Sequence, residues 1–125
     1  MTQPLICVIE DYPDSRVLIT AVLTKAGMEV VTAGSGSELD VLLSNGREPK
    51  LFLIDLSLPG EDGTSILSRL RLDAKFRDTP MIALTAHAMT GDADRGRAAG
   101  FDDYITKPVD VATLPALLSG FIRPA

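Results

Sequence analysis

Short apolar runs and amphipathic segments alternate along the whole 125-residue chain. The apolar runs have the length and β-branched content of buried strands, which we predict over 5–10, 28–33, 51–55, 80–85 and 103–106. The segments that follow them have apolar residues at helical spacing and predict helices over about 13–26, 37–43, 64–74, 90–100 and 113–122. Strands that alternate with helices in this way favour an α/β fold, in which helices cover both faces of a parallel sheet.

The first, fourth and last of these helices have features that bear on their packing. In the first helix, residues at helical spacing mark one face: Leu18, Ala21, Val22 and Lys25. The helix over 90–100 contains two glycines in its interior, Gly91 and Gly96, and few large apolar residues, so we expect it to be weakly held. Pro115 interrupts the pattern of the last helix, which therefore begins late, near Thr113, or kinks at the proline.

The composition indicates a single domain spanning residues 1–125, which is long enough to form its own core. With 12 basic and 17 acidic residues the net charge is −5, and no basic cluster favours binding to nucleic acid. No apolar stretch approaches the roughly 20 residues that cross a bilayer, and the first residues do not resemble a secretory signal. We therefore expect a cytoplasmic protein without membrane partners. The lone cysteine, Cys7, is expected to be a small buried hydrophobe.

Polar side chains that could carry chemistry stand at the ends of four predicted strands. In chain order they are Glu10, Asp11, Asp55, Thr85 and Lys107. In a parallel sheet the carboxyl ends of all strands meet at one edge, where open α/β sheets bind their ligands. Three carboxylates, a hydroxyl and an ammonium at this edge fit a divalent metal together with a phosphoryl group.

Each of these groups has a defined use in phosphoryl chemistry. A carboxylate such as Asp55 can attack phosphorus and form an acyl phosphate. Mg²⁺ prefers oxygen ligands and keeps several of its waters, so a few carboxylates and a backbone carbonyl suffice to hold it. Lys107 can pair with Asp55 and then with phosphoryl oxygens, to which the Thr85 hydroxyl can also donate. Without a metal the carboxylates repel one another, which raises the pKa of at least one of them.

Taken one at a time, these residues are weak indicators of function. An acidic pair after a strand commonly begins a loop, a threonine commonly ends a strand, and a lysine is commonly a solvated surface charge. Asp55 is a stronger indicator, because a charge that ends an apolar strand must be solvated or paired. The joint occurrence at four strand ends indicates a shared site. The only histidine, His87, is most simply a partly exposed loop residue, since no second histidine accompanies it.

Four segments have the sequence pattern of a known family: VIED (8–11), LIDLSLPGEDG (53–63), IALTAHAM (82–89) and AAGFDDYITKP (98–108). Together they make the chain resemble, over essentially its whole length, a response-regulator receiver domain, the CheY-like phosphoacceptor of two-component signalling. The resemblance implies a flavodoxin-like, doubly wound (βα)5 fold with five parallel strands in the order 2-1-3-4-5. Tyr12-Pro13 departs from the usual pattern of the family and is expected to reshape the mouth of the metal pocket.

The resemblance also implies which residues form the site. Asp55 would be the phosphoacceptor, and Lys107 would bind the phosphoryl group. Glu10, Asp11, Asp55 and the backbone carbonyl of Ser57 would surround Mg²⁺ or Mn²⁺.

For signalling, the resemblance implies a stand-alone response regulator that assists its own phosphorylation and dephosphorylation but is not otherwise an enzyme. The donor would be a histidine kinase or a histidine phosphotransfer domain, and the output an unknown protein, because no output segment follows residue 125. Thr85 would be the switch hydroxyl, and the Tyr104 ring would turn inward when Thr85 follows the phosphoryl group. The output surface would then include the fourth helix, the fifth strand and the fifth helix. A cis peptide is expected at Lys107–Pro108.

Three other functions compete with this interpretation. A phosphatase of the haloacid-dehalogenase type also uses an aspartate nucleophile and Mg²⁺, but it needs a second Asp two residues later, where this chain has Ser57. A flavodoxin shares the fold, but its first loop cradles a phosphate that the acidic loop EDYPD (10–14) would repel. A receiver that only docks partners would not need the complete set of acidic, hydroxyl and lysine groups.

Overall fold

The computed structural model describes residues 3–86 and 100–122 of the chain. Five strands form one sheet: β1 (Leu5–Ile9), β2 (Glu29–Ala33), β3 (Leu51–Asp55), β4 (Met81–Thr85) and β5 (Asp103–Thr106). All neighbouring strands are parallel, in the order β2-β1-β3-β4-β5. The predicted fold class and strand order are therefore confirmed.

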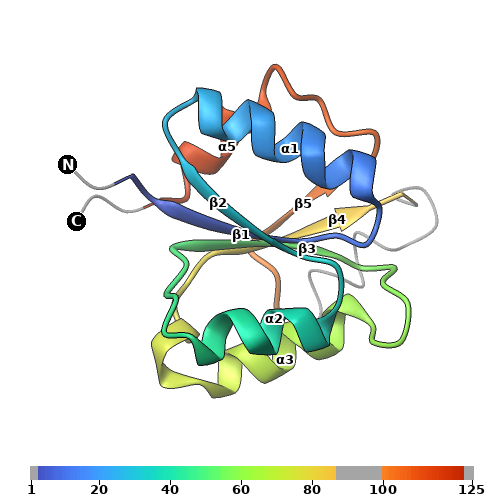
Figure 1. Ribbon diagram of the computed structural model, residues 1–125, viewed down its shortest axis with the longest axis vertical. Coiled ribbons are helices and arrows are strands. Elements are labelled where there is room, and N and C mark those ends of the chain that lie inside the picture. The colour runs from blue at the N-terminus through green and yellow to red at the C-terminus, as the bar shows by residue number, and fades with distance from the viewer. Residues whose placement is uncertain (1–2, 87–99, 123–125) are drawn as a thin grey trace.

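Helices cover both faces of the sheet (Figure 1). They are α1 (Pro13–Lys25), α2 (Gly36–Ser44), α3 (Gly63–Leu72), the 3₁₀ helix η1 (Ala74–Phe76) and α5 (Leu114–Ser119). Helices α1 and α5 lie on one face, and α2 and α3 lie on the other (Figure 1). None of the helices in the described part of the chain is long and apolar enough to cross a bilayer. His87 and residues 90–99 of the helix predicted over 90–100 lie outside the described residues.

Successive residues of the inner strands point to opposite faces of the sheet, and both sets are apolar. Ile6 and Val8 of β1 pack with α1 and α5, whereas Cys7 and Ile9 pack with α2 and α3. Because both faces need apolar side chains, the inner strands are continuous apolar runs in the sequence. Among the described residues, the buried polar side chains all stand at or just past the carboxyl ends of these strands: Glu10, Asp55 and Thr85.

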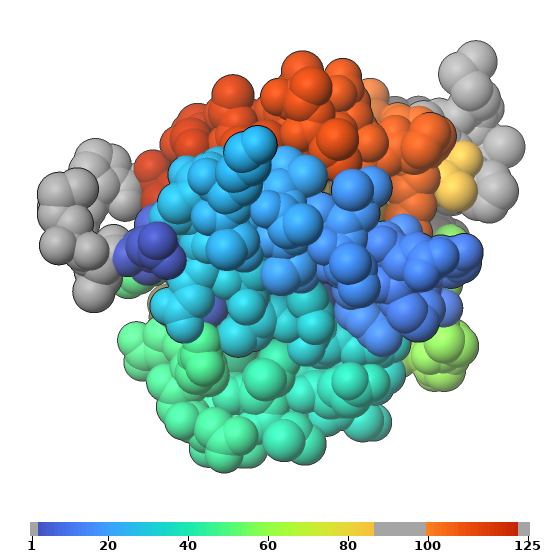
Figure 2. Space-filling model, turned by 45° about the horizontal axis from the view of Figure 1, so that its top comes forward, coloured from blue at the N-terminus to red at the C-terminus, as the bar shows by residue number. Residues whose placement is uncertain are grey.

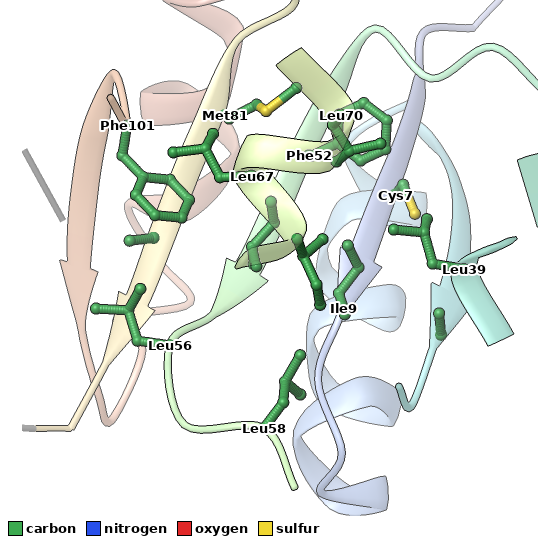
Figure 3. Packing of buried hydrophobic residues seen from close by; sticks show 14 of the residues in the cluster. Cys7, Ile9, Leu39, Phe52, Leu56, Leu58, Leu67, Leu70, Met81 and Phe101 are labelled. Carbon is green, nitrogen blue, oxygen red and sulfur yellow. The ribbon is translucent and has the colours of Figure 1, made fainter. Parts of the chain in front are cut away.

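The core between the sheet and α2–α3 contains the single cysteine. Leu39 of α2 and Leu67 of α3 reach the strands here (Figure 3), and the Phe52 ring meets Phe76 edge-to-face with centroids 5.1 Å apart. Cys7 is fully buried, and this burial raises the pKa of its thiol to about 12. The thiol therefore stays protonated, which agrees with the predicted role as a buried hydrophobe.

Two helix ends are set by local features. Helix α3 ends at Leu72 rather than near residue 74, because the Asp73 side chain accepts a hydrogen bond from the backbone of η1. Helix α5 begins at Leu114 with Pro115 in its first turn, which confirms the late start among the two predicted alternatives. It ends at Ser119, earlier than predicted, although the residues that follow still contact the core.

The buried face of α1 differs from the one marked in the sequence. Ile19 and Leu23 are buried against the sheet, whereas Leu18 keeps 50% of its surface exposed. Figure 2 looks onto this helix, whose atoms (blue) lie between those of α5 and those of the β2–α2 region. The helix has apolar residues on several sides, including the exposed Val17, so helical spacing alone fits more than one stripe. The face that Leu18 marks in the sequence is therefore not the one that packs against the sheet.

Candidate functional site

The short loop between β1 and α1 carries the acidic pair. The Glu10 backbone N–H donates to the Ala33 carbonyl oxygen at 3.0 Å, which ties the end of β1 to the end of β2. The Glu10 side chain is fully buried, while Asp11 is exposed. Pro13 begins α1 two residues later, so the loop holds both carboxylates at the carboxyl edge of the sheet.

Asp55 is the last residue of β3, with only 3% of its surface exposed. Its Oδ1 accepts a hydrogen bond of 2.8 Å from the Ser57 backbone N–H. Gly63 begins α3 directly behind it, and a Cβ there would collide with the Asp55 carbonyl oxygen and lie 2.9 Å from Leu56 Cα. Because a clash with backbone atoms is not relieved by rotating a side chain, the absence of a Cβ lets α3 begin this close to β3.

Lys107 connects the acids of β1 and β3. Its backbone N–H donates to the Thr85 carbonyl oxygen at 2.7 Å, which places the residue just past β5, beside the end of β4. Its Nζ donates to both Glu10 carboxylate oxygens at 2.8 Å and to Asp55 Oδ2 at 2.7 Å. One ammonium thus binds two buried carboxylates from neighbouring strands. The Lys107–Pro108 peptide is cis, as predicted.

These groups meet in a pocket at the carboxyl edge of the sheet. Oxygens of the three acidic side chains, Glu10, Asp11 and Asp55, lie within 4.8 Å of one another. The residues that line the pocket are Glu10, Asp11, Tyr12, Ser15, Asp55, Ser57, Ala86 and Lys107. The structure therefore brings together the predicted acids, Ser57 and Lys107, and it places Tyr12 in the pocket wall.

Thr85 and Tyr104 lie beside the pocket rather than in its wall. Thr85 ends β4 but is fully buried, and Ala86 takes the position in the pocket lining. Tyr104 is on β5, opposite Ala83 of β4, and its partly buried ring packs against the core on the α2–α3 side. The switch roles of Thr85 and Tyr104 stay predictions.

Burial and hydrogen bonds shift the pKa values of the two buried acids in opposite directions. Burial, together with the adjacent Asp55 carboxylate, raises the pKa of Glu10 to about 7. Burial alone would also raise the pKa of Asp55, but hydrogen bonds with Glu10, Lys107 and the Ser57 N–H lower it below its usual value. The predicted rise of one pKa is thus confirmed, although burial contributes more to it than repulsion does. Asp55 is an ionised carboxylate at neutral pH.

The pKa of Lys107 is raised, which keeps its side chain charged. Burial alone would lower this pKa, but the hydrogen bonds to Asp55 and Glu10 outweigh burial and raise it. The side chain is therefore a permanent ammonium at neutral pH, and it offsets only part of the negative charge of three acids. The pocket keeps an excess of negative charge.

The donor set fits a hard divalent cation. Three carboxylates with converging oxygens supply the ligands that Mg²⁺ prefers, and the exposed Asp11 leaves room for the waters that this ion retains. Within the described residues, no other group of three or more acidic, histidine or cysteine side chains comes together in this way.

Three residues at the site were missed by the sequence analysis. Ser15 and Ala86 line the pocket, and Arg16 Nη1 donates to the Glu10 carbonyl oxygen at 2.9 Å. Ser15 and Arg16 lie in the first turn of α1, four and five residues after Asp11. A basic residue one helical turn past an acidic pair is a usable signal, because its side chain can reach back to that loop.

Comparison with known proteins identifies the family. The family model for the response regulator receiver domain matches residues 6–119, which is nearly the whole chain. The chain belongs to this family and is a receiver domain of two-component signalling. The family resemblance of the four sequence segments is thereby confirmed, and the haloacid-dehalogenase and flavodoxin alternatives are excluded.

The relatives differ in how much of their own length the chain covers. RpaA of Synechocystis sp., a DNA-binding master transcriptional regulator, is 36% identical over 120 residues, which cover 96% of this chain and 49% of RpaA. DivK of Brucella ovis, a polar-differentiation response regulator, is 32% identical over 121 residues, which cover 96% of this chain and 97% of DivK. The chain therefore spans about half the length of RpaA and nearly all of DivK.

A solved receiver domain is similar in both fold and sequence. The receiver domain of the sensor histidine kinase PA1611 from Pseudomonas aeruginosa PAO1 superposes with a TM-score of 0.85 at 32% identity. The match covers 95% of this chain and 97% of that one. In that protein a magnesium ion is coordinated in the active site cleft.

Proposed function

We propose that this receiver domain accepts a phosphoryl group on Asp55 from a phosphohistidine donor, in a reaction that requires Mg²⁺ or Mn²⁺. The environment of Asp55 is the observation that supports this proposal most strongly. The carboxylate is buried, has a lowered pKa, and is hydrogen-bonded to an ammonium at 2.7 Å. An ionised carboxylate is the form of aspartate that can attack phosphorus.

In the proposed reaction, an Asp55 carboxylate oxygen attacks the phosphorus atom of a phosphohistidine. The O–P bond forms as the N–P bond breaks, and the donor imidazole leaves with the electron pair of that bond and takes up a proton. Lys107, which already contacts Asp55 Oδ2, offers its ammonium to the phosphoryl oxygens. The domain would thereby assist its own phosphorylation without acting on another substrate.

The metal would be held by Glu10, Asp11, Asp55 and the backbone carbonyl of Ser57. When bound, it would neutralise negative charge on the phosphoryl oxygens during transfer. The convergence of three carboxylates within 4.8 Å supports this assignment. The magnesium-bound receiver domain of PA1611, at 32% identity, supports the choice of metal.

The wider signalling role is part of the same proposal. The donor would be a histidine kinase or a histidine phosphotransfer domain, and the phosphorylated domain would act by contact with another protein in the cytoplasm. Thr85 lies next to the pocket and Tyr104 lies one strand away, so both could pass a change at Asp55 to β5 and α5. The predicted output surface also includes the helix predicted over 90–100, of which residues 90–99 lie outside the described residues.

Incubation with acetyl phosphate followed by intact-mass spectrometry tests the proposal. Wild-type protein should gain one phosphoryl group in the presence of Mg²⁺ and none in excess EDTA. Asp55→Asn should gain none, because an amide is not a nucleophile at phosphorus. The matched control is Asp40→Asn, the same chemical change on the exposed face of α2, and it should react like wild type. No gain in wild type, or an equal gain in Asp55→Asn, would favour a receiver that only docks partners.

A further inference from the structure

Arg16 binds the backbone of the loop that carries the acidic pair. It lies in the first turn of α1, partly buried, and its Nη1 donates to the Glu10 carbonyl oxygen at 2.9 Å and to the Asp11 carbonyl oxygen at 3.3 Å. These two carbonyls belong to residues whose side chains form the proposed metal site. The guanidinium therefore contacts the loop from the backbone side, while the carboxylates point into the pocket.

The space that the Arg16 guanidinium occupies exists because residue 34 has no side chain. A Cβ at Gly34, in the loop after β2, would lie 2.6 Å from Arg16 Nη1 and 2.9 Å from Glu38 Oε2. Both atoms are the far ends of flexible side chains, so they can move away at little cost. The φ angle of Gly34 is not positive, so the backbone there accepts alanine. An alanine at position 34 would thus displace the guanidinium without requiring the backbone to change.

We propose that Arg16 is a positioning residue for cation binding, and that Gly34 provides the space in which it sits. This inference rests on the proposed function, since it concerns the same metal site. Carboxylates of like charge repel one another, and a free loop would let them separate in the metal-free protein. Two hydrogen bonds from one rigid guanidinium hold the Glu10–Asp11 backbone in place, so that less ordering is left to occur when the cation binds.

Electrostatics makes the opposite prediction, which allows the two effects to be separated. Arg16 carries a positive charge close to an acidic pocket, and by Coulomb's law its removal should strengthen the binding of Mg²⁺. If Arg16 acts by positioning the loop, its removal should weaken the binding of Mg²⁺. The sign of the change in affinity therefore distinguishes the positioning role from a simple charge effect.

The test compares Mg²⁺ affinity among four variants by isothermal titration calorimetry. Arg16→Met removes the donors but keeps an apolar stem, and Gly34→Ala displaces the guanidinium but keeps its charge. Both should raise the dissociation constant for Mg²⁺ about tenfold, which is the usual scale for groups that orient metal ligands. Arg16→Lys should recover part of the loss, because an ammonium can still donate to one carbonyl. The control, Arg47→Met, removes an arginine that pairs with Glu29 at the far end of β2.

A second measurement separates positioning from loss of fold. Urea unfolding should show that Gly34→Ala is as stable as wild type within about 0.5 kcal/mol, as expected for a change at a loop position. Amide hydrogen exchange at residues 10 and 11 should become faster in both Arg16→Met and Gly34→Ala. At saturating Mg²⁺, the rate of phosphorylation by acetyl phosphate should return to within about twofold of wild type, since only cation binding is impaired.

Two results would overturn this inference. One is an unchanged or stronger affinity for Mg²⁺ in Arg16→Met and Gly34→Ala while wild type binds the ion normally. The other is an equal loss of affinity in Arg47→Met, which would indicate an effect of net charge or stability. If wild type itself binds no Mg²⁺, the proposed function fails and this inference fails with it, so the two failures are distinguishable.

Discussion

The two ends of the sheet differ in how their charged side chains are balanced. At the amino end, the Asp102 carboxylate accepts hydrogen bonds from Arg71 Nη2 at 3.1 Å and from the Met81 backbone N–H at 2.8 Å. Arg71 Nη1 also donates to three carbonyl oxygens, those of Phe76, Arg77 and Thr79. At the carboxyl end, three carboxylates lie around Lys107, which supplies the only ammonium among the residues that line the described pocket.

The difference shows how the same kind of contact can serve either stability or binding. At the amino end, Arg71 and Asp102 pair with each other and with backbone groups, and these contacts hold α3 and the loop after η1 against the sheet. At the carboxyl end the negative charge exceeds the positive charge, which costs stability but leaves capacity for a cation and a phosphoryl group. Substitutions at the amino end should therefore affect stability, and those at the carboxyl end should affect chemistry.

The largest effect is expected for Lys107→Met. The rate of phosphorylation by acetyl phosphate should fall about 100-fold, because the ammonium that meets the phosphoryl oxygens is lost. Mg²⁺ should nevertheless bind more tightly, since a positive charge has left the pocket. Stopped-time mass spectrometry gives the rate, and calorimetry gives the affinity. A rate within threefold of wild type would contradict a role for this lysine in the reaction.

The next effect is expected at the opposite end of the sheet, for Arg71→Met. This substitution leaves Asp102 without its charged partner and takes the Arg71 donor away from three carbonyls, of which that of Phe76 keeps the Thr79 N–H. The loss should lower the free energy of unfolding by about 2 kcal/mol. Urea unfolding measures the loss. The folded variant should still be phosphorylated at a rate within twofold of wild type.

An exposed arginine of the same segment provides the control for Arg71. Arg77→Met changes the same residue type on the loop after η1, and its effect on the free energy of unfolding should stay below about 0.5 kcal/mol. An equal loss of unfolding free energy in the two variants would contradict the stabilising role of Arg71. A large loss of phosphorylation in folded Arg71→Met would contradict the separation of stability at the amino end from chemistry at the carboxyl end.

A smaller effect concerns the pH dependence of stability in the metal-free domain. The pKa of Glu10 is about 7 in the folded protein and 4.5 ordinarily, so between these values the folded state holds a proton that the unfolded chain has lost. The free energy of unfolding should therefore fall as pH rises from about 4.5 to 7, by on the order of 1 kcal/mol. The lowered pKa of Asp55 and the raised pKa of Lys107 act outside this window, below 3.8 and above 10.5.

Comparison of two glutamine variants isolates the contribution of Glu10. Glu10→Gln cannot titrate, so its stability relative to wild type should improve across this pH range in EDTA. Glu48→Gln, the same change at an exposed position, should keep the wild-type slope. The measurement is urea unfolding at several pH values. An unchanged slope in Glu10→Gln would show that the burial of this carboxyl does not govern the effect.

Much of the fold was predictable because the inner strands are buried on both faces. Apolar runs such as LFLI (51–54) that alternate with amphipathic segments are best interpreted as the inner strands of a parallel sheet. The site was predictable for the same reason, since polar residues that end such runs must gather at one edge of a parallel sheet. The sequence therefore located Glu10, Asp11, Asp55 and Lys107 together.

What could not be predicted depends on side-chain packing between elements. The packed face of α1 could not be predicted because this helix is apolar on several sides, and only contact with the sheet selects Ile19 and Leu23. Thr85 ends its strand as predicted but is buried beside the pocket, which the strand pattern alone does not specify. The Arg16 guanidinium lies where a side chain at position 34 would be, and the sequence pattern does not show that Gly34 and Arg16 are neighbours.

Identifying the residue that carries the phosphoryl group is the most direct test of a metal-dependent site at the carboxyl end of the sheet. After reaction with acetyl phosphate, borohydride reduces an aspartyl phosphate to homoserine, and peptide mass spectrometry then reports which residue was modified. We expect conversion at Asp55 alone, and only when Mg²⁺ or Mn²⁺ is present. Conversion at another aspartate, or at Asp55 equally well in excess EDTA, would contradict the three-acid site.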